Sequence, residues 1–139
     1  MGLSIRNQFP GTVTAVTTGE AMATVKVRLA GGQDITAAIT ADAVKELALA
    51  AGSAVKALVK STEVALATAP LEGISIRNQI EGTVTGVSTG GAMGSVKVSV
   101  EGGELTAAIT KDAVDALGLT AGTPVVALIK STEISLAAA

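Results

Sequence analysis

Apolar and polar residues alternate along several short stretches of the chain, and each such stretch predicts a β-strand. In residues 23–30 the aliphatic side chains of Val25, Val27 and Leu29 fall on one face, and basic side chains occupy the positions between them. The β-branched stretch at residues 12–17 is typical of a strand as well. The chain is therefore expected to build a sheet with one apolar face.

Further strands are predicted on both sides of a single helix. Residues 34–40 follow the turn signal Gly31-Gly32, and residues 55–60 and 63–67 are almost continuously apolar, which suggests burial on both faces. Between them, Thr40 can cap a helix that begins ADAVKEL and whose segment ends at Gly52. Five short strands with one helix between the third and fourth is the element order of a small OB-type barrel.

The whole pattern occurs twice. A shift of 71 places aligns residues 4–32 with residues 75–103, and after a single-residue length change beside a Gly-Gly turn most later positions align as well. We expect an all-β protein of two tandem OB-like five-stranded barrels, with a first domain at residues 1–67, a linker at 68–73 and a second domain at 74–139.

Composition limits the chemistry. The 139 residues contain no Cys, no His and a single aromatic residue, Phe9, and the formal net charge is −2. Disulfides, thiolate or imidazole catalysis and ordinary zinc sites are thereby excluded, and no paired carboxylates or nucleophile–base spacing indicates an enzyme. Without a basic-apolar leader or an apolar run of about 20 residues, we expect a soluble cytoplasmic protein with no membrane partner.

Three motifs resemble a known family. SIRNQ with a following GTV, AAITADAVKELAL and KSTEVAL occur in the same order in both halves, apart from substitutions in the second copy. Together they resemble the Mop domain, and the tandem arrangement resembles a di-Mop molbindin, a cytoplasmic protein for molybdate and tungstate storage or homeostasis. The resemblance implies an OB-like barrel in each half, a homotrimer of chains, and oxyanions bound where neighbouring domains meet.

The resemblance also implies a set of oxyanion ligands. Their chemistry suits a tetrahedral dianion that only accepts hydrogen bonds, because they supply hydroxyls, fixed positive charge and a helix start. The resemblance implies that the bound ion is molybdate or tungstate, with no organic cofactor and no metal cation. The implied residues are Ser4, Arg6, Asn7, Thr40, Lys60 and Ser61 in the first copy and Ser75, Arg77, Asn78, Thr110, Lys130 and Ser131 in the second. A relative can place Ser where this chain has Ala43 and Ala113.

Each of these residues also has an ordinary structural interpretation. Arg6 and Lys60 can be solvated charges, Thr40 a helix cap, and Asn7 a side chain that satisfies the backbone at a strand start. Retention of charge favours the binding interpretation. Arg6, Lys60 and Lys26 keep their charge in the second copy, whereas other cations are lost, with Arg28 replaced by Ser99.

The glutamates near the predicted anion site argue against it, and two other functions remain open. If a strand continued past Ser61, Glu63 would lie on the same face as Ser61 and would repel a bound anion. The same holds for Glu133 and Ser131. The alternatives to oxyanion binding are a ligand-free structural or regulatory oligomerisation module and an OB-type nucleic-acid binder. The second needs stacking aromatics and a basic groove, which this sequence lacks.

Overall fold

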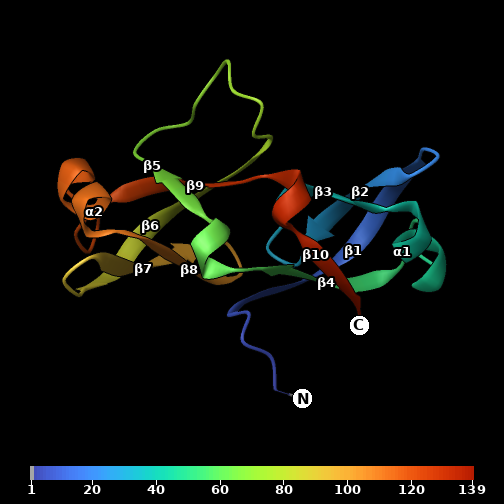
Figure 1. The fold of residues 1–139 in the computed structure, drawn as a ribbon, viewed down its shortest axis with the longest axis horizontal. Coiled ribbons are helices and arrows are strands. Elements are labelled where there is room, and N and C mark those ends of the chain that lie inside the picture. The colour runs from blue at the N-terminus through green and yellow to red at the C-terminus, as the bar shows by residue number, and fades with distance from the viewer. Residues whose placement is uncertain (1) are drawn as a thin grey trace.

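The computed structural model describes residues 2–139 and contains two five-stranded antiparallel sheets, each with one short helix. The two sheets form lobes that lie side by side (Figure 1). The elements of the first repeat are β1 (Asn7–Thr18), β2 (Met22–Leu29), β3 (Asp34–Thr40), α1 (Ala41–Glu46), β4 (Ala54–Val59), the 3₁₀ helix η1 (Ser61–Glu63) and β5 (Ala65–Ala67). Those of the second are β6 (Asn78–Thr89), β7 (Met93–Val100), β8 (Gly103–Thr110), α2 (Lys111–Leu117), β9 (Pro124–Ile129), η2 (Ser131–Glu133) and β10 (Ser135–Ala138). The predicted all-β class and the element order are confirmed.

The last strand of each repeat joins the sheet of the other repeat. The strand orders are β10-β4-β1-β2-β3 and β5-β9-β6-β7-β8. In Figure 1, β10 accordingly lies beside β4 and β5 beside β9. The sequence did not predict this exchange, because the two copies of the strand are so alike that their pattern cannot say which sheet each one completes. We therefore use "first lobe" for the sheet of β1–β4 with β10, and "second lobe" for the sheet of β6–β9 with β5.

The alternating strand predicted at residues 23–30 is confirmed as β2. Val25 and Val27 are fully buried, while Lys26 and Arg28 point to the opposite, exposed face. In the second lobe, Val96 and Val98 occupy the same positions and are equally buried. Burial of these aliphatic faces supplies the main favourable free energy of folding in a chain almost without aromatic residues.

Two local predictions need correction. Residues 55–60 and 63–67 were expected to be buried on both faces, but β4 alternates and leaves Lys56 exposed, and Glu63 and Ala65 are exposed in the second stretch. Among the corresponding strands of the two repeats, only β9, where Val126 replaces Lys56, is buried on both faces. The first helix also ends well before Gly52. It ends at Glu46, with Leu47 as C-cap, and Ala48 adopts a positive φ of 51° just beyond it.

The two lobes meet closely at their β2–β3 and β7–β8 turns. A methyl group at Gly31 would overlap the carbonyl oxygen of Glu101, so the backbones can approach this closely only with glycine there. Gln33 donates from Nε2 to the same carbonyl oxygen at 2.9 Å. These contacts and the exchanged strands fix the lobes against each other.

Candidate functional site

Asn7 and Asn78 join the start of one lobe's first strand to the edge strand of the other lobe. Asn7 donates from Nδ2 to the carbonyl oxygen of Thr106 and accepts from its N–H, both at 2.8 Å. Asn78 makes the same two bonds to Thr36, at 2.9 and 2.8 Å. Each amide thus satisfies a backbone donor and acceptor that an edge strand would otherwise leave unpaired. The structural interpretation of Asn7 is confirmed, and the role of both residues as ligands stays a prediction.

The predicted basic residues flank these asparagines. Asn7 pairs with Val59 at the end of the β1–β4 ladder, so Arg6 and Lys60 are the next residues beyond this pair. The pairing of Asn78 with Ile129 places Arg77 and Lys130 in the same way. All four cations are exposed, and within residues 2–139 none of them forms an ion pair with a carboxylate.

The serines of the KST motifs begin 3₁₀ helices. Ser61 starts η1 and Ser131 starts η2, and η1 packs against β8 while η2 packs against β3. Ser131 Oγ lies 3.5 Å from Asn78 Nδ2, which places this hydroxyl beside the asparagine that anchors β3. Ser4 and Ser75 lie in exposed segments ahead of β1 and β6. The structure therefore gathers Arg, Asn, Lys and Ser at each strand end.

The 3₁₀ turns change the expected position of the glutamates. With about three residues per turn, residues two apart point in different directions, so Glu63 does not share the face of Ser61 as it would in a strand. Even so, Glu63 and Glu133 both line a pocket that Lys130 also lines. The two carboxylates therefore do not point to the same side as the serine hydroxyls, but they lie near Lys130, one of the predicted cations.

Thr40 and Thr110 are helix caps, as predicted. The Oγ1 of Thr40 accepts from the N–H of Ala43 at 3.1 Å, and Thr110 caps Ala113 in the same way. The expected free N–H groups are mostly occupied, since Ala41 also donates, to the carbonyl oxygen of Ala21. An anion could therefore use the threonine hydroxyl proton more readily than the helix backbone.

The threonines stand apart from the other predicted ligands within one chain. Thr40 is four residues beyond Thr36 along β3, or roughly 13 Å at the rise of a strand. Each lobe thus separates the predicted ligands into two groups: a strand end with Arg, Asn, Lys and Ser, and a helix cap with Thr.

Other kinds of site find no support in the described residues. Residues 2–139 contain no cluster of three or more His, Cys, Asp or Glu side chains that could hold a metal cation. None of the helices in this part of the chain is long and apolar enough to cross a membrane.

Comparison with known proteins gives a consistent result. The profile of the TOBE domain matches residues 3–66 and 74–136. The chain is 41% identical to the molybdenum transport protein ModE of Herbaspirillum seropedicae, over 99% of this chain and 52% of that protein. It is also 41% identical to the molybdenum-pterin-binding protein MopB of Rhodobacter capsulatus, over 96% of this chain and 50% of that protein. The chain spans about half the length of these relatives.

A solved structure matches the full chain. It is the cytoplasmic molybdate-binding protein ModG with molybdate bound, which is 38% identical, with a TM-score of 0.97 over 100% of both chains. Both repeats, their order and the complete two-lobed fold are therefore shared with known proteins. The chain belongs to the TOBE domain family, and it carries two tandem copies of that domain.

Proposed function

We propose that this protein binds molybdate, and tungstate in the same sites, to store the ion inside the cell. The observation that carries the proposal is the duplicated strand end, where an exposed Arg and Lys flank an asparagine fixed to the opposite lobe. Two unpaired cations match the charge of a dianion, and the hydroxyl of Ser61 or Ser131 adds a neutral donor. The full-length similarity to ModG, which was solved with molybdate bound, supports the same ligand.

The complete sites lie between chains in this proposal. The strand-end group and the threonine cap of one lobe are too far apart to share a single small ion, so each must be completed by a neighbouring molecule. Exposed Leu3, Met22, Leu71 and Met93 offer apolar surface for such contacts. We propose a homotrimer, with no catalytic activity and no nucleic-acid partner. Sedimentation should give about three times the 13.5 kDa chain mass, and a compact monomer would contradict interfacial sites.

Substitution of the two lysines tests the site. Lys60→Met keeps most of the aliphatic stem and removes the charge and its donors. Loss of a charge-assisted contact to an anion should cost about 1.5–3 kcal/mol, which is roughly a tenfold to hundredfold loss of affinity. Because the sites are duplicated, Lys60→Met should weaken one class of sites, and the double variant with Lys130→Met should weaken both. Calorimetric titration with molybdate measures the change.

Lys45→Met is the matched control, because Lys45 is an exposed lysine in the last turn of α1 and away from the strand ends. It should bind molybdate as the parent does. A double variant that keeps the parent's sedimentation and its full molybdate affinity would refute the assignment of the lysines. A parent protein that binds no molybdate would instead favour a ligand-free oligomerisation module.

A further inference from the structure

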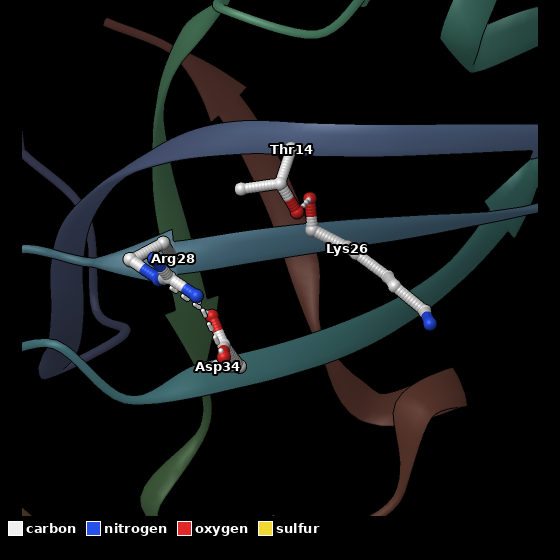
Figure 2. A network of polar contacts seen from close by, with 4 residues as sticks. All are labelled: Thr14, Lys26, Arg28 and Asp34. Atoms are coloured by element: carbon white, nitrogen blue, oxygen red, sulfur yellow. Dashed lines mark hydrogen bonds and ion pairs between the residues drawn. The ribbon is translucent and has the colours of Figure 1, made fainter.

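A basic pocket lies where the outer face of the first lobe meets Arg77 and Asn78 at the start of β6, and neither lysine of the molybdate proposal lines it. It has a volume of about 250 Å³. Its polar and charged lining consists of Thr14, Lys26, Arg28, Asp34, Thr36, Arg77 and Asn78. Figure 2 shows that the first four polar side chains of this set come from three adjacent strands, β1, β2 and β3.

Local strand structure turns these side chains to one face. The β1–β2 register shifts between Val13 and Ala15, so Thr14 is the extra residue of a β-bulge, and its hydroxyl lies 3.3 Å from the carbonyl oxygen of Lys26. Arg28 lies directly opposite Asp34 in the β2–β3 ladder. The bulge and the register together build a polar surface outside the buried valine face.

Arg28 binds Asp34 through two parallel hydrogen bonds. Its Nε lies 2.9 Å from Oδ1 and its Nη2 lies 3.0 Å from Oδ2. This contact lowers the pKa of Asp34 and raises that of Arg28, chiefly through the hydrogen bond. With the arginine and the carboxylate neutralising each other, the positive charges of Lys26 and Arg77 remain, which together balance a dianion.

The second lobe lacks this arrangement. Ser99 stands where the first lobe has Arg28, and Glu104 stands where it has Asp34. With no arginine opposite it, Glu104 approaches Lys97 instead, with Oε1 3.7 Å from Nζ. The corresponding surface therefore keeps one unpaired cation, Arg6, where the first lobe keeps two.

The pocket also contains hydrogen-bond acceptors, unlike the set of donors proposed for molybdate. Each oxygen of Asp34 accepts one bond from Arg28 and retains a second lone pair, and the Thr14 hydroxyl can also accept. Hydrogen phosphate carries two negative charges and one proton, whereas sulfate and molybdate carry no proton at neutral pH. A carboxylate repels each of these dianions, but only hydrogen phosphate offsets the repulsion by donating a hydrogen bond to it.

From this geometry we propose that the first-lobe pocket binds inorganic hydrogen phosphate, with one site per chain. Lys26 and Arg77 neutralise the anion, Arg28 holds Asp34 in place, and the Asp34 carboxylate accepts a hydrogen bond from the P–OH group, which keeps its proton. The second lobe has no equivalent site. The inference does not rest on molybdate binding, although Arg77 and Asn78 belong to both proposed sites.

The test is a titration with inorganic phosphate at pH 8, followed by calorimetry and by the backbone amide NMR signals of Thr36 and Thr106. We expect one phosphate per chain, with the Thr36 signal shifting and the Thr106 signal unchanged. Sulfate and phenyl phosphate, which offer no proton at this pH, should bind at least tenfold more weakly. Equal shifts in both lobes, or equal affinity for sulfate and phosphate, would overturn the proposal.

Three variants sharpen this test without touching the lysines of the molybdate proposal. Arg28→Ser frees Asp34 to approach Lys26 and should lower phosphate affinity at least tenfold. Asp34→Asn removes the carboxylate charge that repels sulfate and replaces one acceptor oxygen by an NH2 donor, so it should reverse the preference toward sulfate. The double change Ser99→Arg with Glu104→Asp should create a second phosphate site, seen as a new shift of Thr106. Failure of all three effects would refute the site.

One variant distinguishes failure of the phosphate proposal from failure of the molybdate proposal. The Lys60→Met and Lys130→Met double variant leaves every residue of this pocket intact, so it should bind phosphate as the parent does. If phosphate binding were lost together with molybdate binding in that variant, the pocket would not be an independent site.

Discussion

Asn7 and Asn78 show how one residue type can determine the position of a whole strand end. Each is 2–3% exposed and places its amide against the backbone of the opposite lobe. A shorter polar side chain could not provide both the donor and the acceptor at that distance. The adjacent Arg and Lys are therefore held relative to β8 or β3, and not merely to their own sheet.

Replacing Asn7 by Ala should lower stability. The change removes two hydrogen bonds and leaves the N–H and carbonyl of Thr106 without partners in a partly buried place, which should cost about 2–4 kcal/mol of unfolding free energy. Denaturant unfolding measures the difference. Gln8→Ala is the control, because Gln8 is exposed and bonds only to the nearby carbonyl oxygen of Ile5. Equal losses for both variants would contradict an anchoring role.

At the scale of elements, the exchange of β5 and β10 is the main feature that the sequence did not predict. Periodicity located the strands, and Thr40 located the helix start, because these signals are local. Partner choice between two similar repeats is not local, since Ala67 and Ala137 occupy equivalent positions in sequence. The exchange depends on where the 3₁₀ turns direct the chain.

In the predicted site, too, local features could be predicted from the sequence and contacts between the lobes could not. Residue types and their retention between repeats located the strand-end cations, and the cap role of Thr40 followed from its place before the helix. The pairing of Asn7 with Thr106, 99 residues away, could not be predicted, because it joins two lobes. The sequence left the position of Glu63 open, because a 3₁₀ turn and a continued strand are hard to distinguish over three residues.

Disulfide trapping tests the strand exchange. Lys56 and Ala137 are register partners in the β4–β10 ladder, so Cys at both positions should form an intrachain disulfide in this otherwise cysteine-free chain. Non-reducing electrophoresis and mass spectrometry detect it. Lys56→Cys with Ala67→Cys is the control, because Ala67 pairs with Val126 of the other sheet. Efficient cross-linking of the control pair alone would show that the strands are not exchanged.

At the scale of the whole molecule, the exchange makes the two lobes interdependent. Each sheet is completed by a strand of the other repeat, and the apolar clusters of both lobes are continuous. The duplicated strand ends are therefore carried by one rigid unit. Such a unit can present the same set of donors at two places, which suits a small ion bound between chains.

Ligand selectivity follows from the size and chemistry of that donor set. The proposed molybdate site offers hydroxyl, guanidinium and ammonium donors held by the strand ends. Sulfate has the same charge as molybdate but is a smaller tetrahedron, so fixed donors placed for molybdate cannot all reach it. Discrimination between the two anions therefore reports directly on a preformed site and not on charge alone.

A competition experiment by calorimetry tests this most directly: the protein is titrated with molybdate in the absence and presence of a large excess of sulfate. The account predicts tight molybdate binding that sulfate barely weakens, and little heat when sulfate is titrated by itself. Equal affinity for sulfate and molybdate, or complete displacement of molybdate by sulfate, would contradict the proposed function.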